Sequence, residues 1–182
     1  MLETLNVGAW ADHVTVTIVI VTVVYGIRVG AYESTALGLR WLGAVFGGVA
    51  LALHELPGRE LETLDVPPEV ARALGLVLCV TILFVGSTVA LRRIEAWQDV
   101  PVPRLPRPID ALLGGSAGCM TGLVVAGLLQ VIWMMPVIPN AMRIDERALD
   151  KRCGERLLST FADFTGVDRD MIHARVVGKP AQ

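Results

Sequence analysis

The chain has 182 residues, of which 53% are hydrophobic and 19% are charged, and its formal net charge at pH 7 is −2. Soluble domains carry about 25% charged residues, so this composition argues against a soluble protein. The near-neutral charge excludes the basic surface that nucleic-acid-binding proteins use. The charged residues gather in residues 55–72, 92–110 and 143–170, and long uncharged runs separate these segments. Such segregation is typical of an integral membrane protein, whose first partner is the lipid bilayer.

Four apolar segments are predicted to be membrane-spanning helices, since about 20 apolar residues in a helix cross a hydrocarbon core of about 30 Å. The first, residues 14–30, includes eleven consecutive β-branched residues, a composition that in water favours a buried strand. The alternative is therefore a core strand of a soluble α/β protein. We favour the helix because the run is too long for an ordinary strand and three further apolar segments follow it.

A short hairpin with the sequence GIRVGAYESTALGLR joins the first and second segments. Arg28 and Arg40 lie on either side of Glu33 in this hairpin, and Arg40 falls near the start of the second segment. Charges in or near a membrane are expensive and are therefore candidates for function. Two interpretations stay open: both arginines pair with Glu33 and fix the hairpin, or they extend to the lipid headgroups.

The second segment, residues 37–53, contains the glycine pair Gly43 and Gly47. Small residues four positions apart on a membrane helix let another helix approach closely, so we predict a helix-packing site at this pair. The third segment, residues 73–91, has no charged residue and follows a proline pair, which is a helix-start signal.

The fourth segment, residues 111–136, begins with the glycine-rich stretch GGSAGCMTG. Each interior glycine destabilises a helix in water by up to about 1 kcal/mol relative to alanine. In lipid, small residues instead permit the close backbone packing that holds helices together. We therefore predict a smooth groove on one face of this helix, for packing within the bundle or between subunits. Its members recur every four residues and are Gly114, Gly118, Gly122 and Ala126.

Gln130 is the one strongly polar residue deep in the fourth segment. We predict that its amide forms an interhelical hydrogen bond, with the lining of a permeation path as the alternative. Threonines in the first segment can bond to backbone carbonyls one turn back and need no functional explanation.

After the fourth segment the chain becomes polar, so residues 1–142 are expected to form the membrane domain and residues 143–182 a helical tail. We predict a tail helix over residues 144–164, ended by Gly166 as a C-cap, and a loose chain from residue 174. An apolar stripe on this helix is expected to lie on the bilayer surface or to pack on the bundle, with a partner-docking face as the alternative. The stripe consists of Leu157, Leu158, Phe161 and Phe164. The predicted fold class is all-α, a bundle of four transmembrane helices with an amphipathic helical tail.

The arginine distribution predicts how the chain crosses the membrane. The first and third connections hold two and four arginines, and the second holds two. The positive-inside rule therefore places the first and third connections in the cytoplasm and the N-terminus and the tail outside. Cations in the tail favour the opposite side for the C-terminus, but we predict the orientation with both ends outside.

No recognised catalytic or metal-binding arrangement stands out in the sequence. The chain has no H-E-x-x-H, no phosphate loop and no C-x-x-C. Its three cysteines are too scattered for a disulfide framework or a zinc site. We therefore expect no catalytic residue, no metal and no cofactor, and a protein that is not an enzyme.

Three features of the chain carry a resemblance to a known family. The first is Asp12, an acid directly before the first span. The second is the hairpin, with matching positions at Gly26, Arg28, Gly30 and Glu33. The third is the opening of the last spanning helix, with matching positions at Asp110, Gly114 and Gly118. Over roughly residues 7–135 the chain resembles the colicin V production protein (CvpA) family of bacterial inner-membrane proteins.

This resemblance implies a four-span protein of the bacterial inner (cytoplasmic) membrane without a known catalytic activity. It further implies a link to colicin V-type toxin production and secretion and to envelope homeostasis. We expect a scaffold or accessory subunit that packs with copies of itself or with another membrane complex. The alternative is a small transporter or channel-like export component, whose path would pass Gln130.

Overall fold

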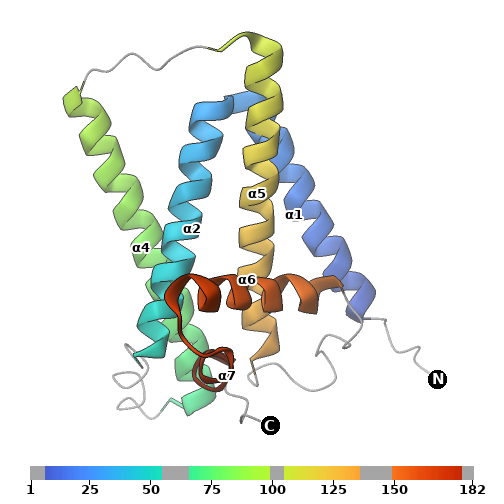
Figure 1. The fold of residues 1–182 in the computed structure, drawn as a ribbon, viewed down its shortest axis with the longest axis vertical. Helices are drawn as coiled ribbons and strands as arrows, with labels where there is room; N and C mark the ends of the chain where they lie inside the picture. The colour runs from blue at the N-terminus through green and yellow to red at the C-terminus, as the bar shows by residue number, and fades with distance from the viewer. Residues whose placement is uncertain (1–6, 55–65, 99–104, 136–148, 178–182) are drawn as a thin grey trace.

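Figure 1 shows an all-α chain, as the sequence predicts. The computed structural model describes residues 7–54, 66–98, 105–135 and 149–177, and these ranges contain helices and no strand. The elements are α1 (Val7–Val29), α2 (Ala31–Leu53), α4 (Pro68–Gln98), α5 (Arg107–Met134), α6 (Leu149–Thr165), α7 (Arg169–Ile172) and the π-helix η2 (His173–Val177). The first four helices are each long and apolar enough to cross a membrane, which indicates a multi-pass membrane protein.

The β-branched run of the first segment forms a helix, so the strand alternative is wrong. A helix pairs its backbone groups within one segment, and a bilayer core requires this because it offers no water to bond them. The hydroxyls of the run also bond to their own helix. Oγ1 of Thr17 donates to the His13 carbonyl at 2.7 Å, and Oγ1 of Thr22 donates to the Ile18 carbonyl at 2.9 Å. The modest helix propensity of β-branched residues does not prevent the helix here.

The spanning helices extend beyond the apolar segments that identify them. Helix α2 begins at Ala31 rather than at residue 37, because Gly30 alone separates it from α1. Gly30 has a φ of 90°, a conformation that favours glycine, and this one residue reverses the chain. Prolines set the other starts, since Pro68 is the first residue of α4 and Pro106 directly precedes α5.

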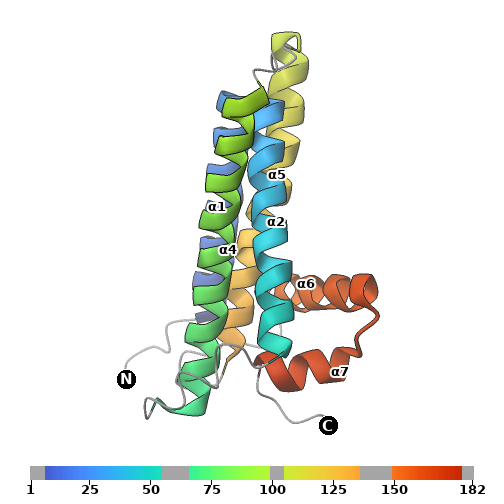
Figure 2. The same cartoon turned by 90° about the vertical axis from the view of Figure 1, so that its left-hand side faces the viewer.

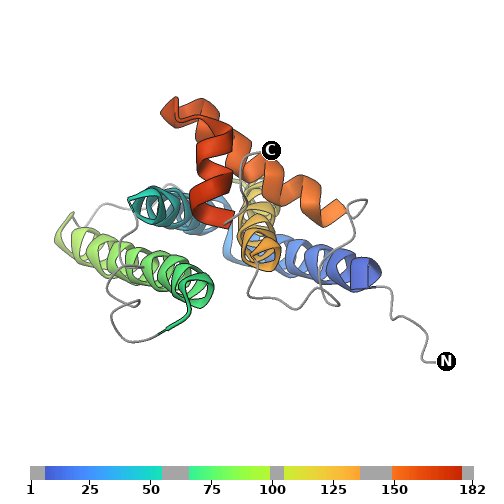
Figure 3. The same cartoon turned by 90° about the horizontal axis from the view of Figure 1, so that it is seen from below.

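The four spanning helices stand side by side in an open row (Figure 3). Their order in the row is α4, α2, α5, α1, and successive helices in this order pack against each other. The chain runs alternately up and down, so α1 and α4 begin, and α2 and α5 end, at one end of the molecule (Figures 1 and 2). The tail helices lie at that same end and cover one face of the row.

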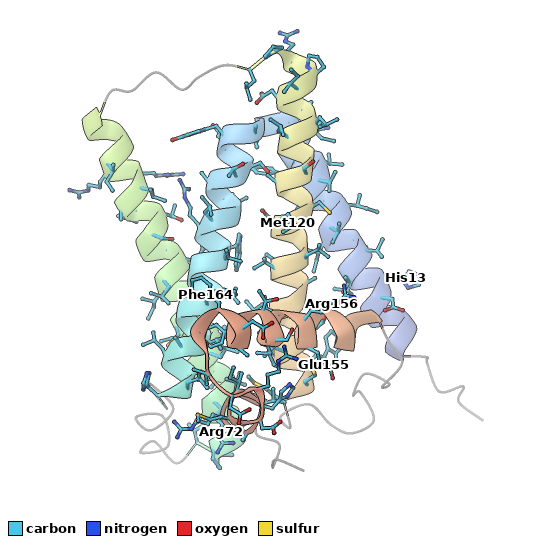
Figure 4. All side chains as sticks on the ribbon, viewed as in Figure 1. His13, Arg72, Met120, Glu155, Arg156 and Phe164 are labelled. Carbon is cyan, nitrogen blue, oxygen red and sulfur yellow. The ribbon has the colours of Figure 1, made fainter. Side chains whose placement is uncertain are left out.

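The tail packs on the row and shares its core. Leu158 and Phe161 of α6 are each 2% exposed and belong to the same cluster of buried side chains as Val45 of α2. The rings of Phe46 and Phe161 meet edge to face with centroids 5.5 Å apart. The inner part of the predicted apolar stripe therefore packs on the bundle. Phe164, at the far end of α6, remains 80% exposed (Figure 4).

Helix α6 ends where the sequence predicts. Gly166 has a φ of 69°, and its N–H donates to the Ala162 carbonyl at 2.8 Å, which is the geometry of a glycine C-cap. The predicted start of this helix, residues 144–148, lies outside the described residues.

The expectation of a loose chain from residue 174 is wrong for residues 174–177, which belong to η2. Val176 and Val177 are each 2% exposed and lie in the core shared with the spanning helices. Nη1 of Arg175 donates to the Leu53 carbonyl at 2.7 Å. A cation at a helix C-terminus interacts favourably with the helix dipole, so this bond ties η2 to the last turn of α2. Residues 178–182 lie outside the described part.

Candidate functional site

The glycine face of α5 lies directly on α1, in a contact that we call the α1–α5 seam (Thr22, Gly26, Gly114, Gly118 and Gly122). A Cβ atom added at Gly114 would clash with the carbonyl oxygen of Gly26, and one added at Gly26 would clash with the carbonyl oxygen of Gly114. At Gly118 the obstacle is the carbonyl oxygen of Thr22, and at Gly122 it is the hydroxyl of the same threonine. Backbone atoms cannot swing aside as a side-chain end can, so this approach requires glycine.

Hydrogen bonds close the seam at the end where α1 turns into α2. Oδ1 of Asp110 accepts the Ala31 N–H at 2.9 Å, so a residue of α5 caps the start of α2. The hydroxyl of Ser34 is buried and donates to the Gly114 carbonyl at 2.9 Å. A Cβ at Gly30 would lie 2.5 Å from Oδ2 of Asp110, which leaves glycine as the residue that fits at the turn. Three helices therefore meet at this corner.

Beyond the seam the small-residue face of α5 continues to Ala126, which is 1% exposed, and then to Gln130, which is 3% exposed. Oε1 of Gln130 accepts the Gly154 N–H of α6 at 2.6 Å, and its Nε2 donates to Oγ1 of Thr15 on α1 at 3.2 Å. Gly154 is itself confined, because a Cβ there would lie 2.6 Å from the terminal methyl of Met134. Gln130 thus forms the interhelical hydrogen bond that the sequence predicts, and it extends this bonding to the tail.

Of the second predicted packing pair, on α2, only one member packs against another helix within the chain. No described atom lies within 4 Å of a Cβ added at Gly43, whereas Gly47 faces the end of the Leu83 side chain on α4 at 2.7 Å. The residue that packs beside Gly47 is Gly48, whose added Cβ would lie 2.5 Å from Cγ2 of Val80. The two helices diverge beyond Gly47 toward the α4–α5 connection (Figure 1), which leaves Gly43 open.

Of the two interpretations of the hairpin charges, the pairing of both arginines with Glu33 is wrong. Arg28 and Glu33 are exposed, and neither forms an ion pair with a residue in the described ranges, while Arg40 lies half-buried on α2. The hairpin is fixed instead by the backbone turn at Gly30 and by Asp110. Sequence reasoning placed Asp110 at the opening of the last span but could not assign it this cap, because its partner lies 79 positions away along the chain.

A short sequence motif in α5 resembles a catalytic motif, and the structure shows whether the motif has the required fold around it. Residues 114–118 spell G-x-S-x-G, the pattern of a nucleophile elbow, which requires a strand, a sharp turn and a helix. Ser116 lies inside helix α5, and its hydroxyl donates to the Leu112 carbonyl at 2.9 Å. The pattern is therefore part of the packing face. Among the described residues there is no group of three histidine, cysteine or acidic side chains that could hold a metal ion.

Comparisons with known protein families, with characterised proteins and with solved structures find no match. The interpretation of the site therefore rests on its geometry. The resemblance to the CvpA family stays a prediction from the motifs quoted above.

Proposed function

We propose that this chain is a non-enzymatic membrane protein, a scaffold or accessory subunit of the kind that the CvpA resemblance implies for colicin V-type toxin production or secretion and envelope homeostasis. The proposal rests on one observation: polar side chains inside the spanning helices form hydrogen bonds between helices. Asp110, Ser34 and Gln130 each bond one helix to another. Polar groups in the membrane are default candidates for function, and here their work is to hold the structure together.

The transporter alternative has less support because the groups that its path would need are already engaged. The side-chain oxygen and nitrogen of Gln130 each form a hydrogen bond with another helix. Threonine hydroxyls bond within their own helices as well, as at Thr81, which donates to the Val77 carbonyl at 2.7 Å, and at Thr121, which donates to the Ala117 carbonyl at 2.9 Å. A path past Gln130 would have to break the bonds by which its amide joins α5 to α1 and α6.

The surface available to a partner follows from the same geometry. The glycine face of α5 is filled within the chain, whereas α4 packs mainly on α2 and presents exposed apolar side chains elsewhere, such as Val85, Val89 and Ile82. No described atom lies within 4 Å of a Cβ added at Gly86 of α4 or at Gly43 of α2. We therefore place partner contacts of the scaffold on the α2–α4 side of the row.

Co-purification from native membranes in mild detergent, with the intact mass of the assembly, tests this function. We expect a stoichiometric partner that is lost in Gly86→Leu or Gly43→Leu at unchanged thermal stability. Met120→Leu is the matched control, since Met120 is 66% exposed on α5, away from the α2–α4 side (Figure 4). A homo-oligomer without a partner that carries solute flux in proteoliposomes would contradict the scaffold and support the transporter.

A further inference from the structure

An open cavity lies between α6 and the α7–η2 segment of the tail. Its volume is about 520 Å³, and its walls are formed by Glu155, Arg156, Leu158, Ser159, Arg169 and His173. Figure 4 places Glu155 and Arg156 together on α6, at the opposite end of the helix from Phe164. Two arginines and a histidine thus line one concave surface, whereas the Ser159 hydroxyl donates to the Arg156 carbonyl of its own helix at 2.9 Å.

The cavity lies at the level where the membrane ends. Helix α6 is bonded to Gln130, four residues before the end of α5, and this amide also reaches Thr15, close to the start of the apolar span that begins at Asp12. Helix α6 therefore crosses the row at the boundary of the spans (Figure 1). Helix α7 lies beyond it, farther from the middle of the spanning helices (Figure 2). An amphipathic helix at this depth lies among lipid headgroups.

Two groups in the cavity match the chemistry of a phosphate. Arginine presents its N–H groups in a planar fork that binds phosphate oxygens bidentately, and a histidine N–H can add a further bond. Arg169 forms an ion pair with Asp163 at 2.9 Å, with both side chains more than half exposed. Such a solvent-exposed pair contributes little stability, so the guanidinium can turn to a bound anion. Glu155, the acidic member of the wall, can accept a hydrogen bond from a hydroxyl or ammonium group next to the phosphate.

We propose that this cavity binds the phosphate-bearing head group of a phospholipid, with Arg156 and Arg169 on the phosphate and Glu155 on a donor group of the head. The exposed ring of Phe164 would contact the acyl region at the other end of α6. A head group with a donor, such as phosphatidylglycerol or phosphatidylethanolamine, is preferred over phosphatidylcholine, whose choline has no hydrogen to donate. A soluble phosphate ester shares the phosphate chemistry and is the other source to be distinguished.

The test is native mass spectrometry of the full-length protein in mild detergent, titrated with phosphatidylglycerol, phosphatidylethanolamine or phosphatidylcholine of one acyl composition, or with glycerol 3-phosphate. We expect the first two lipids to bind more tightly than phosphatidylcholine. Arg156→Gln and Arg169→Gln should each weaken this binding roughly tenfold, the size of one lost charged hydrogen bond. Arg72→Gln is the matched control, because Arg72 is an exposed arginine of α4 outside the cavity (Figure 4), and it should leave binding unchanged.

A variant that is expected to strengthen lipid binding separates an effect on the site from a loss of folding. Asp163→Asn frees Arg169 from its ion pair and should strengthen lipid binding severalfold, which a merely destabilised protein would not do. Equal lipid binding by the wild type, Arg156→Gln and Arg169→Gln would overturn the site. Binding of glycerol 3-phosphate with the same arginine dependence, and no such dependence for any lipid, would overturn the lipid as the ligand.

Discussion

The α1–α5 seam and the α2–α4 contact both place glycines between spanning helices, yet they are built differently. At the seam, Gly114 and Gly118 face carbonyl oxygens of the partner helix. At the α2–α4 contact, Gly47 faces the flexible end of the Leu83 side chain, whereas Gly48 faces Cγ2 of the branched Val80 side chain at 2.5 Å and the Val80 backbone N and Cα at 3.4 and 3.5 Å. Side chains carry the rest of this second contact, including the Trp41 and Phe84 rings with centroids 4.4 Å apart.

Small residues spaced four positions apart therefore permit close packing of a helix, but this spacing alone does not determine where the close packing occurs. Close approach also needs a partner helix that presents bare backbone at the same height, as Gly26 does opposite Gly114. Helix α4 presents the Leu83 side chain to Gly47 instead, and it diverges from α2 toward its own C-terminal end (Figure 1). Glycine should therefore be indispensable at the seam, whereas Gly47, which faces only the end of a flexible side chain, should be replaceable at the α2–α4 contact.

Gly118→Ala should produce the largest effect. Its methyl would clash with the Thr22 carbonyl and would lie 3.1 Å from Cα of Val23. Overpacking of this kind costs about 1–3 kcal/mol, and the rigid backbone on both sides places Gly118→Ala at the upper end. The measurement is the free energy of unfolding of the purified protein in mixed micelles. An unchanged free energy of unfolding would show that the seam is looser than described.

Gln130→Leu should have the next largest effect, because it removes the acceptor of a buried N–H on Gly154 and a bond to Thr15. Each of the two lost hydrogen bonds contributes about 0.5–1.5 kcal/mol. The loss should appear as faster limited proteolysis within the tail, since α6 loses its polar link to α5. Gln130→Glu, which keeps an acceptor oxygen, is the matched control. Equal tail proteolysis in the wild type and Gln130→Leu would mean that apolar packing alone holds α6.

Asp110→Ala should destabilise by about 1–2 kcal/mol, the usual effect of removing a helix cap. Asp110→Asn keeps an oxygen that can accept the Ala31 N–H and should retain most of the stability. The two variants are compared by the same unfolding measurement in micelles. If Asp110→Asn is as damaging as Asp110→Ala, the negative charge and not the acceptor stabilises the start of α2.

Gly43→Ala should have the smallest effect and the opposite sign. A Cβ there meets no described atom within 4 Å, and alanine is the better helix former by up to about 1 kcal/mol. We expect a free energy of unfolding that is equal to the wild type or slightly higher. A loss as large as that of Gly118→Ala would mean that the two glycine pairs are equivalent after all.

Local sequence patterns predicted much of this fold. The four apolar segments identified the spanning helices, the stripe at Gly114 and Gly118 identified a face that allows close approach, and Gly166 identified a C-cap. Each of these rests on neighbours within a few turns, where residue type and spacing decide the outcome.

The features that the sequence did not predict depend on which helices pack together and on how far each is shifted along its neighbour. The bonds from Asp110 to Ala31 and from Ser34 to Gly114 join residues 79 and 80 positions apart. The start of α2 at Ala31 was missed because a single glycine is enough to reverse the chain, and apolarity does not mark such a short turn. The burial of Val176 beside the row was missed because two valines in a polar tail give no periodic signal.

The central claim, that the glycine face of α5 is filled within one chain, can be tested by a cysteine cross-link between Ile27 and Gly115. A Cβ at Gly115 would lie 3.1 Å from Cγ1 of Ile27, and a disulfide needs Cβ atoms about 3.5–4.5 Å apart. In a variant whose three native cysteines are replaced by alanine, oxidation of Ile27→Cys/Gly115→Cys should give a monomer that has lost two hydrogens in its intact mass. A covalent dimer on a non-reducing gel, without the internal cross-link, would place this face between subunits and contradict the account.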